Sequence, residues 1–299
     1  TNGDVLRFAD ERGAFPTYVH PVGEDEDPFA AETVTGIPLG LISDAVLGSR
    51  MGRELVCAWT SPLGTSELWY RLLNIGKPIA AMSGTDAYVD FHRTPALGTG
   101  RNYLRLQGAA PSPEAILDAA IAGRGFVTTA PALVFRIGDD VRPGDVTAPG
   151  PQDWTLELAS TVAVDRVEIL VNGKVISELE GVAGGERRTH SGQVDLPEGG
   201  WIAARAFSSE RPADAWPSMH VRPFAHSSPI WFGTIGSIHP EAAASAAADL
   251  RRGIEAARQR ALDAYGDRPM PRMYARFDEA DAALGALIAT PDSTDEKLD

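Results

Sequence analysis

Residues 53–82 constrain the fold most, because they read as a strand, a helix and a second strand in succession. Residues 53–59 and 78–82 are apolar runs, and residues 65–76 between them have the composition of a helix. This alternation predicts a βαβ unit and a parallel sheet. Asp86 follows the second strand closely. Side chains at the carboxyl ends of parallel strands commonly carry the chemistry of such folds.

The remaining patterns divide the chain into three parts. Residues 1–137 alternate between strand and helix patterns and are expected to form an α/β part. From residue 150 the apolar period changes to two, and Asn172-Gly173 lies between two apolar runs, which predicts a β-hairpin within a β-sandwich over residues 150–235. The Gly- and Pro-rich residues 138–152 read as a linker. Residues 238–290 are rich in strong helix formers and predict C-terminal helices.

Composition excludes several classes of protein. The net charge of −14 over 299 residues argues against a nucleic-acid binder, which needs clustered Lys and Arg. No apolar run is long enough to predict a membrane span. The single cysteine, Cys57, cannot form an internal disulfide and reads as a small buried side chain. The chain starts at Thr1 and not at Met, which predicts that a leader or an N-terminal segment was removed, as in a periplasmic or secreted protein.

Two residues of metal-ligand type follow apolar strands directly. His20 comes after residues 15–19, and Asp86 comes after residues 78–82. An imidazole and a carboxylate suit zinc, manganese or iron. Taken singly, each residue also has a structural interpretation, His20 as a hydrogen-bonded residue before Pro21 and Asp86 as a turn or cap residue. Glu54 is left out of the ligand set, because a carboxylate at the start of a strand is expected at the opposite edge of the sheet.

The loop after Asp86 contains the candidates for substrate contact. His92 and Arg93 lie in it, and Arg101 ends it. His92 is open to three interpretations, as a ligand, a proton donor or an ordinary loop histidine. The chain has no nucleophile elbow, no P-loop and no His-Glu-x-x-His motif. These absences leave metal-assisted chemistry as the class that the residues favour.

The order of several short motifs resembles the CehA/McbA family of PHP-domain metallohydrolases. The resemblance covers most of residues 10–235 and rests on Tyr18-Val-His-Pro21, Leu55-Val-Cys-Ala-Trp59, Leu68-Trp-Tyr-Arg-Leu-Leu-Asn-Ile-Gly76, Ser83-Gly-Thr-Asp-Ala87, Gly100-Arg-Asn-Tyr103, Val171-Asn-Gly-Lys-Val175, Gly200-Trp-Ile-Ala-Ala-Arg205 and Phe224-Ala-His-Ser-Ser-Pro229. It implies the C-terminal part of a PHP-type distorted β/α barrel, followed by a β-sandwich and C-terminal helices. It also implies one to three divalent ions and hydrolysis of an ester, carbamate, amide or phosphoester.

The resemblance assigns roles to some residues, and at other positions the sequence departs from the family's pattern. His20 matches the metal-binding His of the family's His-Pro motif, and Asp86 matches the metal-binding Asp of its final motif. The His that often follows this Asp is replaced by Ala87 and Tyr88, and the family's opening His-x-His motif does not occur in this sequence. Because a catalytic zinc takes about three protein ligands, we expect an N-terminal segment or a second chain to complete the metal site.

Two functions from different classes remain in view. In the first, a metal-activated water attacks a small-molecule substrate, His20 and Asp86 hold the metal, and His92, Arg93 or Arg101 positions the substrate or the leaving group. In the second, the incomplete barrel has no activity, and the sandwich and the C-terminal helices form a binding or assembly module. The helices leave a homo-oligomer open in either case.

Overall fold

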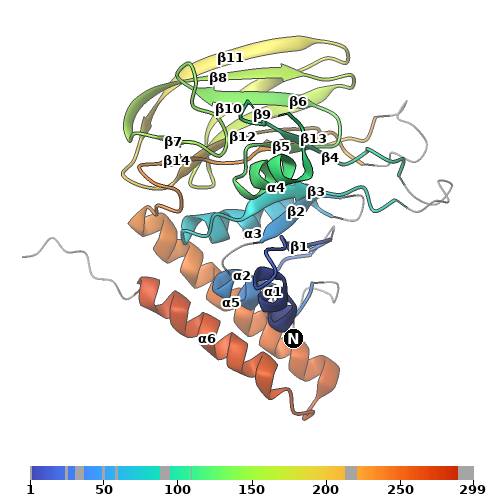
Figure 1. The fold of residues 1–299 in the computed structure, drawn as a ribbon, viewed down its shortest axis with the longest axis vertical. Coiled ribbons are helices and arrows are strands. Elements are labelled where there is room, and N and C mark those ends of the chain that lie inside the picture. The colour runs from blue at the N-terminus through green and yellow to red at the C-terminus, as the bar shows by residue number, and fades with distance from the viewer. Residues whose placement is uncertain are drawn as a thin grey trace, which may run out of the picture.

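The computed structural model describes residues 2–23, 26–30, 37–48, 51–57, 60–87, 95–108, 110–212 and 221–288. The fold is mixed α/β, with a small parallel sheet between a strand-rich part and a pair of long helices (Figure 1). Within the described residues there are six helices. None of these helices combines the length and the apolar character that crossing a bilayer demands.

The predicted βαβ unit is confirmed. The parallel sheet has the order β1-β2-β3, with β1 at Thr17–Tyr18, β2 at Gly52–Val56 and β3 at Ala80–Ser83. Helix α3 (Pro62–Asn74) connects β2 to β3 and begins where sequence rules place it, because Ser61 accepts a hydrogen bond from the Gly64 N–H and a proline occupies the first turn. The three strands do not close into a barrel within the described part of the chain.

Two sheets that share one apolar core form the strand-rich part, as expected for a β-sandwich. The larger sheet has eight strands: β4 (Arg101–Leu104), β5 (Gly125–Thr128), β7 (Val146–Thr147), β9 (Val164–Val171), β10 (Lys174–Val182), β12 (Trp201–Phe207), β13 (Phe224–Ser227) and β14 (Ile230–Phe232). The smaller sheet has the order β11-β8-β6, made of Arg187–Leu196, Gly150–Ala159 and Ala132–Ile137. The predicted hairpin is present as β9 and β10, and its turn residues Asn172 and Gly173 both have positive φ, as a two-residue type I′ turn requires.

The sandwich draws on more of the chain than residues 150–235. Strands β4 and β5 pair with each other and extend the larger sheet beyond β13, and β6 belongs to the smaller sheet. All three come from residues predicted to belong to the barrel part. The stretch predicted as a linker contains β7, which pairs with β14. Parallel pairing with a segment far along the chain overrides the composition signal that suggested a linker here.

Helices cover the remaining faces. Helix α5 (Pro240–Tyr265) and helix α6 (Pro271–Ile288) form the predicted C-terminal pair and are joined by ion pairs of Arg251 with Asp281 and Arg258 with Asp278. Their apolar faces enter the same core as α3 and the parallel sheet. The shorter helices are α1 (Asn2–Asp10), α2 (Leu41–Leu47) and α4 (Pro113–Ile121).

Candidate metal centre

The ends of the three parallel strands bring four polar side chains to one edge of the sheet. His20 follows β1, Cys57 follows β2 and Asp86 follows β3, while Glu54 lies within β2. Ligand atoms of His20, Glu54 and Cys57 all lie within 4.8 Å of one another. The His20 Nε2 is 3.5 Å from the Asp86 Oδ2. The two residues predicted as metal ligands are therefore brought together.

Hydrogen bonds fix the centre of this cluster. The backbone N–H of His20 donates to Glu54 Oε2 at 2.7 Å, which ties the turn after β1 to the neighbouring strand. Burial raises the pKa of the Glu54 carboxyl, and the charge of Asp86 also raises it, whereas the hydrogen bonds from His20 and the Cys57 thiol lower it. Glu54 is only 4% exposed, so its carboxylate is held where few waters can solvate it.

The backbone at both predicted ligands is unusual. His20 has φ of 35° and Asp86 has φ of 50°, and among the described non-glycine residues only Asn172 shares a positive φ with them. Side chains disfavour this region, and residues held there concentrate at functional sites. Asn172 is accounted for by its hairpin turn, so the other two positive φ values mark the cluster.

Two close backbone approaches shape the loop that carries Asp86. A Cβ on Gly84 would lie 2.3 Å from Glu54 Oε1, and a Cβ on Gly100 would lie 2.4 Å from the Gly84 carbonyl oxygen. Only glycine fits at these two positions without displacing its neighbours. The Asn102 side chain accepts a hydrogen bond from the Ser83 N–H and donates one to the Ser83 carbonyl, both at 2.8 Å, which fixes the end of β3 beside β4.

The other predicted site residues have different outcomes. His92 and Arg93 lie outside the described residues. Arg101 begins β4 and donates from Nη2 to the Thr129 carbonyl at 2.7 Å, which directs its guanidinium toward β5 and not into the cluster. Its Nε is buried and has no hydrogen-bond partner among the described residues.

Glu54 and Cys57 are the cluster members that the sequence did not reveal. Excluding Glu54 as a residue at the wrong edge of the sheet was an error, because its carboxylate contacts the His20 backbone beyond the end of β1. The register between β2 and β3 shifts after Glu54, so an irregularity in the strand lies directly beside it. The available signal was a pair of charged residues, Arg53 and Glu54, inside an otherwise apolar buried strand.

His226 belongs to a different polar group, at the junction of helix α3 with the sandwich. Its Nε2 lies 2.5 Å from the Tyr70 hydroxyl and its Nδ1 lies 2.7 Å from the Ser227 carbonyl oxygen. Burial lowers the pKa of His226 to about 3, so the ring is neutral near pH 7. Since a carbonyl oxygen only accepts, Nδ1 carries the proton and the Tyr70 hydroxyl donates to Nε2. Neither ring nitrogen is left for a metal.

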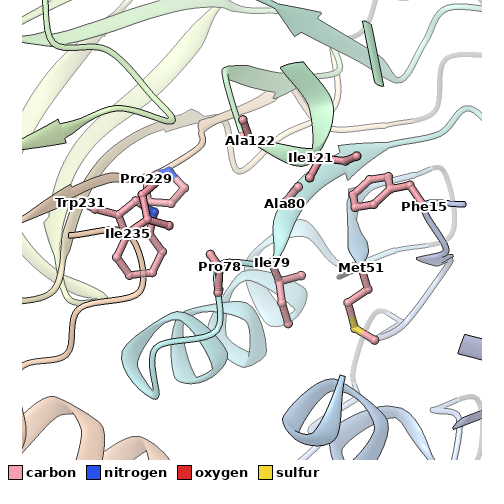
Figure 2. Close-up of a pocket in the computed structure, with 11 residues that line it drawn as sticks. Phe15, Met51, Pro78, Ile79, Ala80, Ile121, Ala122, Pro229, Trp231 and Ile235 are labelled. Atoms are coloured by element: carbon pink, nitrogen blue, oxygen red, sulfur yellow. The ribbon is translucent and has the colours of Figure 1, made fainter. Parts of the chain in front are cut away.

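An apolar pocket of about 190 Å³ lies at the opposite edge of the parallel sheet (Figure 2). Phe15, Met51 and Pro78 precede the three strands and line it together with Ile121 from α4 and Trp231 from β14. Its lining contains no acid, base or thiol. The polar cluster and this pocket thus lie at opposite ends of the same strands. Of the two, the cluster at the carboxyl ends has the side chains suited to metal binding.

Comparisons with known proteins give little guidance. No family model and no curated protein matches the chain. Among solved structures, the CARDB domain of a Pyrococcus furiosus protein, determined by NMR and also crystallised with di-metal ions, is 15% identical and covers 33% of this chain and 94% of its own length, with a TM-score of 0.21. The C-terminal domain of wzt is 13% identical and covers 49% of this chain and 85% of its own length, with a TM-score of 0.22. TM-scores this low carry no argument about this chain.

Proposed function

We propose that this chain is the C-terminal part of a PHP-type metal-dependent hydrolase similar to the CehA/McbA family. The observation that carries the proposal is the convergence of His20, Glu54, Cys57 and Asp86 at the carboxyl edge of three parallel strands. Polar residues at this edge are where barrels of alternating strands and helices place their chemistry. The substrate class is an ester, carbamate, amide or phosphoester.

The donor set fits a divalent metal. An imidazole, a carboxylate and a thiol within 4.8 Å of one another match the ligands that zinc accepts, and the thiol favours zinc over magnesium or calcium. Glu54 is buried beside Asp86 with its pKa raised by burial, so a cation would relieve an unfavourable pair of carboxyl groups. His20, Glu54 and Cys57 would hold the ion, and Asp86 would join them or orient the His20 ring.

The chain's own residues have positioning roles in this proposal. When bound, the metal supplies Lewis-acid activation of water and of the substrate's carbonyl or phosphoryl oxygen. Gly84 leaves room for the Glu54 carboxylate, and Asn102 fixes the strand end from which Asp86 follows. Arg101 is proposed to hold the start of β4 through its bond to the Thr129 carbonyl, and His92 and Arg93 are proposed as substrate contacts.

We further infer that another polypeptide segment completes the site. Strand β1 is the outer strand of the parallel sheet, and no described strand pairs with its other edge. Next to it, Arg53 is 2% exposed, and its Nε and Nη2 have no hydrogen-bond partner among the described residues. Buried guanidinium groups are normally paired, so a segment added beside β1 would provide both strand pairing and acceptors for Arg53.

Metal content tests the proposal first. We expect elemental analysis of the purified protein to give stoichiometric zinc, manganese or iron, and intact-mass measurement to detect the completing polypeptide. His20→Ala and Glu54→Gln should each lower the metal content and the hydrolysis of p-nitrophenyl esters and phosphodiesters. His239→Ala, at the start of α5 and without a side-chain cap bond, is the matched control. A single polypeptide that stays metal-free after reconstitution with each of the three metals would refute the hydrolase and leave the binding module.

A further inference from the structure

A second pocket, of about 230 Å³, opens between the two sheets of the sandwich. It is lined by residues of β4 and β5 on one side, by β6 on the other, and by Arg142 and Pro143 after β6. It shares no residue with the metal cluster. Its lining combines aromatic and aliphatic side chains with three arginines, Arg105, Arg124 and Arg142, which is an unusual composition for the surface of a protein with a net charge of −14.

An aromatic pair forms one wall of this pocket. Tyr103 on β4 and Phe126 on β5 are direct cross-strand partners, and their rings stack with centroids 4.8 Å apart and planes within 7° of parallel. Strand β4 is the outer strand of its sheet, and Tyr103 is 46% exposed. The wall is therefore a stacked aromatic pair, and a ligand ring can contact the ring edges and the outer face of the exposed Tyr103.

The arginines differ in how they are neutralised. The Arg105 guanidinium donates to both carboxylate oxygens of Asp145 at 2.7 Å, so its charge is paired. The guanidinium groups of Arg124 and Arg142 have no acidic partner among the described residues. Asp145 is also held by the Arg142 backbone N–H at 3.0 Å, which fixes that carboxylate on Arg105. The pocket thus has an apolar wall and two unpaired positive charges.

We propose that this pocket binds a small aromatic carboxylate. Its ring would lie against Tyr103 and Phe126, and its carboxylate would be bound by Arg124 and Arg142. A guanidinium presents two parallel donors that match the geometry of a carboxylate, and a neutral alcohol could not satisfy two such groups. A small inorganic anion would leave the aromatic wall uncovered. The proposal rests on different residues from the metal centre and holds whether or not the chain is a hydrolase.

Calorimetric titration of the whole chain with phenylacetate at low salt tests the proposal. We expect saturable binding with one site, much weaker binding of benzyl alcohol, which has the ring without the charge, and of acetate, which has the charge without the ring. The double variant Arg124→Gln/Arg142→Gln should weaken phenylacetate binding about tenfold or more, because hydrogen bonds to charged groups are among the strongest.

Two further variants keep the test decisive. Arg136→Gln is the matched control, because Arg136 lies on β6, pairs with Glu157 and does not line the pocket. If the double variant does not fold, Tyr103→Ala replaces it, since the exposed ring can be removed at little cost to the core, and it should weaken phenylacetate but not acetate binding. Absence of saturable phenylacetate binding to the wild-type chain, equal binding of acetate, or an equal effect of Arg136→Gln would overturn the proposal.

Discussion

The two polar clusters next to the parallel sheet differ in the kind of contacts that their side chains make. At the α3–sandwich junction, Arg205 donates to Glu168 at 2.6 Å and to the Tyr70 hydroxyl at 3.2 Å, and Tyr70 in turn donates to His226. Each of these side chains is buried and has a hydrogen-bond partner within this network. At the strand ends, ligand-type atoms of His20, Glu54 and Cys57 lie within 4.8 Å of one another, a spacing that suits a shared cation.

Under the proposed function, this difference separates structural polar residues from those that would bind a metal. A fully hydrogen-bonded network in a dry environment rigidifies a junction, and its members have no capacity left for a ligand. The junction also includes Asn74, which accepts from the Trp201 indole N–H at 2.8 Å and donates to the Asn172 carbonyl at 3.0 Å. Much of the motif set that resembles the CehA/McbA family is therefore accounted for by the docking of the sandwich on α3.

Among the variants that separate the two clusters, Glu168→Gln should change the stability of the protein most. Removing one partner of a buried ion pair leaves Arg205 uncompensated, so we expect the free energy of unfolding to fall by about 3–5 kcal/mol in urea titrations. The metal affinity of the folded protein should not change. Glu180→Gln is the control, because it removes an exposed pair with Arg188 that contributes about 1 kcal/mol or less. Equal losses in both variants would contradict a junction held by the buried pair.

Acid should weaken the same junction through His226. Its pKa is about 3 in the folded protein because of burial, against 6.5 for the free side chain, so between these values the unfolded chain binds a proton that the folded chain excludes. Stability from this group is therefore complete above pH 6.5 and falls as the pH is lowered, by about 2 kcal/mol at pH 5.

Comparing pH profiles isolates this contribution. Urea titrations of wild type and His226→Gln between pH 5 and 7.5 should show a smaller slope for the variant, because the carboxyl groups contribute equally to both profiles. His239→Ala provides the control for removal of a histidine outside the junction. Parallel profiles for wild type and His226→Gln would contradict a neutral buried ring.

Local patterns in the sequence predicted the elements better than their assembly. The βαβ unit, the Asn172-Gly173 hairpin and the C-terminal helices follow from periodicity, caps and turn chemistry, which act over a few residues. The membership of β4, β5 and β6 in the sandwich depends on pairing between segments far apart in sequence, which no local pattern encodes. The proximity of His20 and Asp86 could be predicted because each follows a strand of one parallel sheet, and their metal-binding role stays a prediction. The place of Glu54 beside them could not, because it depends on how β2 and β3 are aligned.

The smallest effect is expected from Gly84→Ala, which tests the proposed metal-binding role of the strand-end cluster. A Cβ at residue 84 would lie 2.3 Å from Glu54 Oε1, so the carboxylate must shift from its position beside His20 and Cys57. Since groups that orient a ligand typically contribute 10–100-fold to metal affinity, we expect zinc affinity to fall by about that factor in a competitive chelator titration.

The control is Gly285→Ala in α6, where an added Cβ meets nothing within 4 Å and helix propensity improves. Neither change should alter the stability that the α3–sandwich junction contributes, because neither glycine contacts the junction. The pH dependence of stability that is set by His226 should therefore stay the same in both variants. Zinc affinity that is the same in Gly84→Ala and wild type would mean that Glu54 does not hold the metal. Glu54 would then have to be removed from the proposed ligand set of the strand-end cluster.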